Sequence, residues 1–291
     1  MIDEFERNGK LGNRRAYKGS YNSLNSFTGD NLDICFEDIT QGWLLNYESW
    51  LRAKGNKETT ISIQFRTLRS VYNKAIKRKC VGKEYYPFED FHINKFNVHT
   101  DKRAISKNDV LKIISADLTG KSEYVKFSRD IFVFSYLCGG INFCDVASLT
   151  KENILNGRLF YVRQKTGKQI NLCLTKNASA IIDKYYKGGK GFLFPILDVT
   201  RHITATQREN RLHKVLGQVD KSLKIVAQIA KVDVNLTTYV ARHSYATVLK
   251  RSGVPTSIIC ESLGHSSERV TQIYLDSFEN EQIDEAMKNL L

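Results

Sequence analysis

Three side chains near the C-terminus have the types needed to cleave a phosphodiester without a metal ion. Arg242 stands in ARHSYA, His265 follows it by 23 residues in LGHSS, and Tyr274 follows after nine more in QIYLDSF. A guanidinium is always charged, and its fork matches two phosphate oxygens. A tyrosine, with an ordinary pKa near ~10, needs a cationic site to attack as a phenolate. A histidine can donate to the phosphate or manage a proton.

The sequence around these side chains predicts short helices that position them. One helix is expected from about residue 238 to Gly253, a second over 255–264, and a third, carrying the tyrosine, over 267–275; the first two end at a glycine. Because His265 follows the end of the second helix, we expect the helix dipole to favour its charged form.

In order and spacing, the segment from Thr237 to Phe278 resembles the catalytic region of the tyrosine recombinases, the phage-integrase family. The resemblance implies that Arg242 and His265 hold a scissile DNA phosphate and that Tyr274 attacks it. Taken singly, each has an ordinary structural explanation, as a salt-bridged helical arginine, a helix cap and a core tyrosine. The order and spacing together favour catalysis. For His243, on another face of the same helix, we expect a structural, hydrogen-bonded role.

The stretch RLFYVRQKTGKQINLCLT, from Arg158, alternates and predicts a β-hairpin or small sheet that turns at Thr166-Gly167. Lys165, at the end of the first strand, matches the hairpin lysine of the family. The resemblance implies that it is the general acid for the leaving 5′ oxygen. The alternative is a solvated turn lysine, and Lys168 is the neighbour that could be confused with it.

Two positions depart from the family pattern. Asn142, in GGINFCDVASL, stands where the first arginine of the family is expected, and an amide donates hydrogen bonds but supplies no charge. Arg129, one helix earlier, is our hypothesis for a substitute. Tyr239 stands where His or Lys is usual; it can hydrogen-bond a phosphate or support the histidine but is a poor base. Integrases of Bacteroidetes mobile elements resemble this chain in the non-arginine and in the wording YVARHS.

Residues 1–100 predict an all-helical domain, in which the stretch from Asn56 to Cys80 is the longest helix. One face of this helix is apolar and the other is basic. The basic face suits DNA phosphates and groove edges, although a run of charge is also typical of a solvated face. The resemblance to a helical core-binding domain favours DNA. The candidate DNA-binding residues are Arg66, Arg69, Lys74, Lys77 and Arg78.

Residues 104–291 predict a catalytic domain, so the expected fold is mainly α with a small β-sheet in two domains. We expect an apolar helix from Ser128, a polar loop over 197–211, and a helix from Asn210 that is broken at Gly217. A C-terminal helix over 279–291 has an apolar stripe that suits its own core or a neighbouring protomer.

Composition supports a soluble protein with a polyanionic partner. The 291 residues are 42% hydrophobic and 26% charged, with a net charge of +13 and a pI of about 9.4. No apolar run is long enough to span a bilayer, and no signal peptide or extra N-terminal arm-binding domain is evident. The six cysteines have no metal or disulfide spacing, which predicts buried, reduced thiols in a cytoplasmic protein without metal or cofactor.

The function predicted from these features is site-specific DNA recombination. The resemblance implies a 3′-phosphotyrosine intermediate, a Holliday junction, and a homotetramer on double-stranded DNA, with accessory DNA-bending proteins as further partners. Two alternatives stay open at this point. One is a catalytically impaired DNA-binding regulator of the same fold, and the other is strand cleavage and relaxation like that of the type IB topoisomerases.

Overall fold

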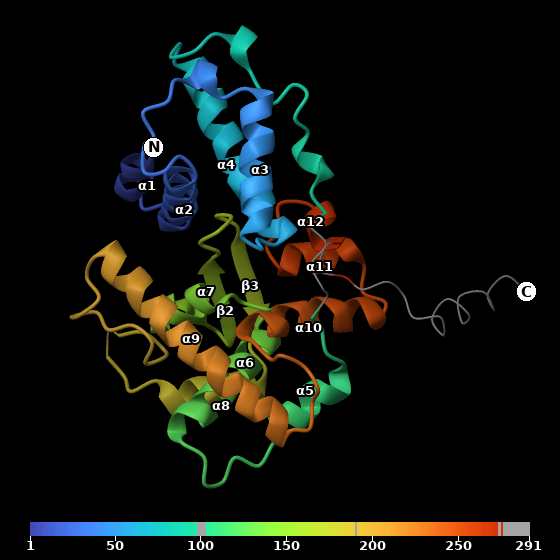
Figure 1. The fold of residues 1–291 in the computed structure, drawn as a ribbon. Coiled ribbons are helices and arrows are strands. Elements are labelled where there is room, and N and C mark those ends of the chain that lie inside the picture. Colours follow the sequence, from blue (N-terminus) through green and yellow to red (C-terminus); the bar gives the residue numbers. More distant parts are fainter. Residues whose placement is uncertain (98–102, 190, 273–274, 276–291) are drawn as a thin grey trace, which may run out of the picture. The chain divides into compact units, whose positions relative to one another are not determined.

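The chain forms two compact units, Met1–Asp101 and Lys102–Leu291, in a computed structural model that describes residues 1–97, 103–189, 191–272 and 275 (Figure 1). The first unit is helical throughout its described residues, apart from loops and short 3-10 turns. Its helices are α1 (Ile2–Arg7), α2 (Leu11–Phe27), α3 (Gln41–Ala53) and α4 (Glu58–Lys77).

Aromatic side chains on α3 and α4 form the core of the first unit. Phe65 of α4 is fully buried and packs against Tyr47 of α3, with ring centroids 5.5 Å apart. The segment after α4 folds back over the same ring, since the ring centroids of Phe91 and Phe96 lie 4.7 and 5.3 Å from that of Phe65. Burial of each such ring contributes about 1.5–3 kcal/mol, so the apolar face of α4 holds this unit together.

The second unit is built around α6, whose Phe132 and Phe134 are fully buried. Helices α5, α8, α9 and α10 all pack against it (Figure 1). This arrangement explains why nine of the fifteen residues of α6 are buried. The helices are α5 (Lys107–Ile114), α6 (Glu123–Leu137), α7 (Phe143–Ser148), α8 (Lys176–Tyr185), α9 (Ala205–Ile229), α10 (Thr238–Arg251), α11 (Thr256–Ser262) and α12 (Glu268–Gln272).

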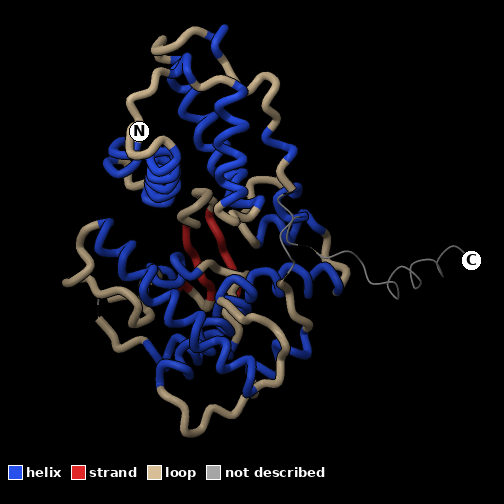
Figure 2. Tube along the Cα trace, in the orientation of Figure 1, coloured by secondary structure: helices blue, strands red, loops and turns tan. Residues whose placement is uncertain are grey.

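A three-stranded antiparallel sheet, in the order β1-β2-β3, completes the second unit (Figure 2). Its strands are β1 (Ile154–Leu155), β2 (Arg158–Val162) and β3 (Gln169–Cys173). Alternate residues of β2, Leu159 and Tyr161, are buried, as the period of two requires. The predicted fold class, mainly α with a small β-sheet, is confirmed. No helix among the described residues is both long and apolar enough to cross a membrane.

Several local predictions were wrong. Helix α9 begins at Ala205, because Thr204 caps it by accepting from the Gln207 amide, and it runs through Gly217 without a break. The loop expected over 197–211 is therefore shorter. Three of the six cysteines, Cys35, Cys80 and Cys173, are exposed rather than buried. The predicted helix 279–291 lies outside the described residues.

Candidate active site

Helix α10 buries Arg242, which is 1% exposed. Its Nη1 donates to the carbonyl of Gly140, after α6, at 2.8 Å, and its Nη2 donates to the carbonyl of Leu263, at the end of α11. The guanidinium therefore ties three helices together. A side chain restrained in this way keeps its orientation whether or not a ligand is present, which favours preorganised recognition of an anion.

Gly140 makes the close approach to Arg242 possible. Its φ is +64°, and a Cβ there would lie 2.9 Å from the Arg242 Cα and 3.0 Å from Cγ. Only glycine fits this backbone and this contact together.

Replacing Gly140 by alanine is therefore expected to cost on the order of 3 kcal/mol of folding stability and to displace Arg242, because left-handed strain adds to steric overlap. Gly157→Ala is the matched control, since Gly157 has φ +73° but nothing within 4 Å of its added Cβ. It should cost only about 1–2 kcal/mol. Urea unfolding of both variants measures the difference, and equal losses would contradict the steric account.

His265 follows Gly264 directly and is 2% exposed. Its Nδ1 lies 2.9 Å from the Thr271 hydroxyl of α12. Its pKa is lowered from 6.5 to about 3. Burial is the largest cause, followed by the positive charges of Arg242, Arg163, Lys165 and Lys168. The expectation that the helix dipole would favour the charged form was wrong, because burial and four nearby cations outweigh it. The imidazole is neutral at physiological pH.

Acidification is accordingly expected to destabilise the protein through His265. Its folded-state pKa lies below the ordinary value, so its contribution is complete above pH 6.5 and is lost as the pH falls toward 3. Between pH 7 and pH 5 the loss is about 2 kcal/mol. Denaturant unfolding at pH 7, 6 and 5 should show this loss in the wild type and not in His265→Gln. An identical pH dependence in the two proteins would contradict it.

The predicted hairpin is confirmed, with Gly167 at φ +69° in the turn between β2 and β3. Lys165 lies in this turn and is exposed, beyond the strand in which we expected it. The turn is held in place at its centre, because the Thr166 hydroxyl donates to the Gly264 carbonyl at 3.0 Å. Lys165 is thus one residue from a group that contacts the α11–His265 turn.

Arg163, which the sequence analysis did not single out, is the second buried arginine of this region. It is 3% exposed, and its Nη1 donates to the Gly264 carbonyl at 2.7 Å. A signal for it existed in the sequence, because the alternation that buries Leu159 and Tyr161 places residue 163 next on the same face. Arg163 was missed because it directly follows a mostly apolar strand.

Asp145 of α7 is a buried carboxylate that was also missed. Its Oδ1 accepts from the Gln164 amide at 3.0 Å, while Oδ2 has no hydrogen-bond partner among the described residues. Burial raises its pKa, and the Gln164 amide, the charges of Arg163 and Arg242, and the side chain of Asn142 oppose that rise. Asn142 is half-buried at the start of α7, so it belongs to this cluster without adding charge to it.

Arg129 does not join the cluster. Its Nε donates to Asp130 at 2.7 Å, and its Nη1 contacts the carbonyls of Ile114 and Ala116, at the end of α5. Along α6 it stands eight residues before Leu137, the last residue of the helix, about 12 Å away at the helical rise. The hypothesis that Arg129 replaces the first arginine was therefore wrong.

Tyr239 and Tyr274 are the remaining candidates. Tyr239 is 45% exposed on α10, and its ring lies 4.9 Å edge-on from that of His243. Tyr274 lies outside the described residues. Leu275, which follows it, is 2% exposed and packs with residues of α10 and α11. Among the described residues no group of His, Cys, Asp and Glu is arranged to hold a metal ion.

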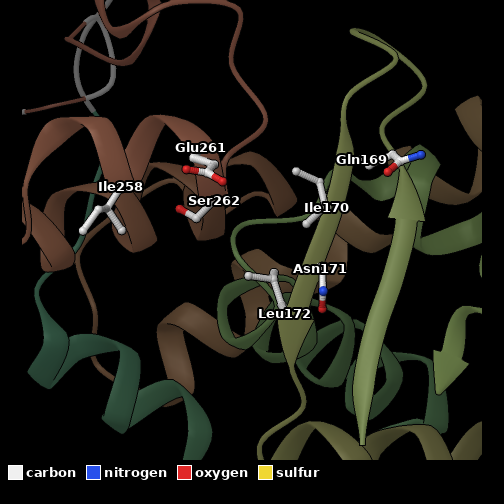
Figure 3. Close-up of a pocket in the computed structure, with 7 residues that line it drawn as sticks. All are labelled: Gln169, Ile170, Asn171, Leu172, Ile258, Glu261 and Ser262. Carbon is white, nitrogen blue, oxygen red and sulfur yellow. The ribbon is translucent and has the colours of Figure 1, made fainter. Parts of the chain in front are cut away.

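A separate hollow lies beside this cluster. Figure 3 shows a pocket of 360 Å³ between β3 and α11, lined by Gln169, Ile170, Asn171, Leu172, Ile258, Glu261 and Ser262. Its single charged residue, Glu261, is acidic. The pocket is therefore a poor place for a phosphate.

In the first unit, the basic face of α4 is partly neutralised. Arg66, Arg69 and Lys77 are exposed, but Lys74 donates to Glu4 of α1 at 2.7 Å, and Arg78 lies 3.7 Å from the same carboxylate. The Lys74 contact lowers the pKa of Glu4 and keeps it charged. One acidic residue of α1 thus faces two candidate DNA contacts.

Removing that charge is expected to strengthen binding to any duplex. Glu4→Gln should raise affinity by roughly two- to fivefold and steepen its dependence on salt, because two more cations become available to phosphates. Glu89→Gln, in an exposed loop of the same unit, makes the same charge change as a control. Fluorescence anisotropy over a salt series measures both, and equal effects would show that only net charge matters.

Comparison with known proteins agrees with this architecture. Residues 1–97 match the phage integrase SAM-like domain and residues 103–281 match the phage integrase family. The tyrosine recombinase XerD of Halalkalibacterium halodurans is 24% identical over 81% of this chain and 77% of its own. The integrase of Escherichia phage P2 is 21% identical over 88% of this chain and 67% of its own.

Solved structures show the same fold. A lambda integrase fragment, residues 75–356, bound as a dimer to a core site superposes with a TM-score of 0.65 at 15% identity, covering 96% of this chain and 99% of that one. The Tn1549 transposon integrase in complex with a circular-intermediate DNA superposes with a TM-score of 0.66 at 16% identity, covering 97% of this chain and 93% of that one.

Fold and site together define a two-unit, mainly helical protein whose second unit gathers arginines and a neutral histidine around one turn. The chain belongs to the phage integrase family. It is a tyrosine site-specific recombinase, as its sequence predicted. The recombinases and integrases among its relatives favour strand exchange over the impaired regulator and the topoisomerase-like alternative.

Proposed function

We propose that Tyr274 attacks a DNA phosphate held by Arg242 and His265. A bond forms between the phenolic oxygen and phosphorus while the bond from phosphorus to the 5′ oxygen breaks, leaving a 3′-phosphotyrosine and a 5′-hydroxyl. The observation that supports this most is the convergence at the end of α11. There the Leu263 carbonyl accepts from Arg242, and His265 stands two residues further on.

The charge states of these groups fit their proposed tasks. Arg242 supplies permanent positive charge to the non-bridging oxygens as charge builds up in the transition state. His265, neutral because of its lowered pKa, can donate one hydrogen bond without being a strong acid. Lys165 is exposed on a turn tied to the same region, where it can deliver a proton to the departing 5′ oxygen.

The 5′-hydroxyl then attacks the phosphotyrosine of a partner duplex, first for one pair of strands and then for the other, through a Holliday junction. Each step exchanges one phosphodiester for another, so neither ATP nor a metal cofactor is required. A homotetramer on double-stranded DNA suits this sequence of steps. Its support is a lambda integrase tetramer bound to a Holliday junction, whose chain superposes on this one with a TM-score of 0.64 at 16% identity.

Further parts of the proposal concern regions away from the chemistry. The basic face of α4 would contact DNA phosphates through Arg66, Arg69 and Lys77, joined by Lys74 and Arg78 when Glu4 releases them. The segment 279–291 would dock on a neighbouring protomer, and accessory proteins would bend the DNA. The uncharged Asn142 and the stretch YVARHS support a place among integrases of Bacteroidetes mobile elements.

A nicked duplex tests the proposal, because the short strand released by cleavage diffuses away and traps the covalent complex. The recombination site is first recovered by covalent trapping from a randomised duplex library. We expect a denaturation-resistant protein–DNA adduct and, on adding a second intact duplex, joining between the two DNAs. DNA binding without any adduct would indicate a regulator, and adducts without joining would indicate relaxation.

A further inference from the structure

We propose that Arg163 donates to the scissile phosphate and supplies the positive charge that Asn142 lacks. This inference rests on the proposed function and concerns the same site. A phosphodiester undergoing attack presents two non-bridging oxygens, both of which gain negative charge. Arg242 donates one N–H of Nη1 and one of Nη2 to the carbonyls of Gly140 and Leu263, which leaves it fewer donors for the phosphate, so a second cationic donor is needed to surround both oxygens.

Burial without a counter-ion is the first argument for Arg163. The side chain is 97% buried, and none of the ion pairs formed by the described residues includes it. Its Nε is shielded from solvent and has no hydrogen-bond partner among the described residues. A buried guanidinium in this condition is costly for folding unless a ligand compensates, which is typical of a binding group rather than of packing.

The nearest acidic group does not cancel this charge. Asp145 feels both Arg163 and Arg242, yet no ion pair joins it to either among the described residues. Its Oδ1 is occupied by the Gln164 amide at 3.0 Å. Two buried arginines thus share one incompletely paired carboxylate, and the surplus positive charge suits a phosphate monoanion.

The backbone at the end of α11 places the two arginines close together. Arg242 donates to the carbonyl of Leu263 and Arg163 to that of Gly264. Consecutive residues have Cα atoms about 3.8 Å apart, so two like charges approach one turn from α10 and from the hairpin. Gly264 permits this, because at φ +62° an added Cβ would lie 3.2 Å from the Arg163 Cδ. His265 follows at once.

The competing explanation is that Arg163 only ties the hairpin to this turn through its bond to Gly264. The two roles differ in what they need from the DNA. A phosphate contact matters less when the scissile linkage is a neutral methylphosphonate, because a neutral group requires less positive charge. A purely structural tie is equally important with either linkage.

The experiment measures adduct formation by the full chain on nicked duplexes that carry either linkage at the cleavage position. For Arg163→Met we expect a loss of roughly 100-fold or more on the phosphodiester, the usual effect of removing one transition-state donor. On the methylphosphonate the loss should be at least tenfold smaller. Arg158→Met is the matched control, since Arg158 begins the same strand, is exposed, and bonds Asn171 at 2.6 Å. It should react like the wild type.

Two further variants separate the outcomes. Arg163→Lys, which keeps the charge on a single donor nitrogen, should lose less than Arg163→Met and decides the matter if the Met protein does not fold. Adding Asn142→Arg to the Arg163→Met protein should raise the rate of adduct formation on the phosphodiester at least tenfold above that of Arg163→Met alone. Equal losses on the two linkages in whichever variant folds would overturn the inference. Failure of the wild type to form a Tyr274-dependent adduct would instead overturn the proposed function.

Discussion

Tyr274→Phe is expected to abolish the covalent DNA adduct, with a loss of more than 10³-fold, while DNA affinity stays within twofold of the wild type. Phenylalanine removes the only atom proposed to bond phosphorus, and no other group in the proposed mechanism can replace it. Denaturing gel electrophoresis of trapped complexes measures the adduct, and a mobility-shift titration measures the affinity.

Tyr21→Phe serves as the control for this result, because Tyr21 is an exposed residue of α2 in the other unit. It removes the same hydroxyl group and should leave adduct formation intact. An adduct that persists at the wild-type level in Tyr274→Phe would mean that another residue is the nucleophile.

Arg242→Met should have the second largest effect and should act on folding as well as on catalysis. The carbonyls of Gly140 and Leu263 lose their donor in the interior, which costs about 1–3 kcal/mol for each group left without a partner. The loss of a preorganised cation should lower adduct formation by about 10²–10³-fold. Thermal unfolding and single-turnover trapping measure the two effects separately.

Arg251→Met provides the comparison for Arg242→Met. Arg251 is in the last turn of the same helix but is exposed, so the same substitution should change adduct formation by less than about twofold. If Arg242→Met lowered stability but reacted at the wild-type rate once folded, Arg242 would be a structural residue and the site would need another cation.

The sequence predicted much of this molecule because its signals were local. The apolar stripe of α4 and the turn at Gly167 each follow from a few neighbouring residues. Arg242 and His265 could be singled out for the same reason, since their motifs are short. Helix α9 was misjudged at Gly217, because packing on α6 outweighs the weak helix propensity of a single glycine.

The predictions that were wrong, and the residues that were missed, depend on contacts between segments distant in sequence. The neutral state of His265 results from its burial and from cations on α10 and the hairpin, which its own helix end does not reveal. The position of Arg129 depends on carbonyls of α5, and the importance of Arg163 depends on a carbonyl 101 residues away. No local pattern contains these distances.

The most direct test of the central claim is to identify the amino acid that becomes bonded to DNA. The trapped adduct is digested with protease and nuclease, and the nucleotide-bearing peptide is sequenced by tandem mass spectrometry. The account predicts a single modified peptide with the nucleotide on Tyr274, joined through a 3′ phosphate. A nucleotide on any other residue, or one joined through a 5′ phosphate, would contradict it.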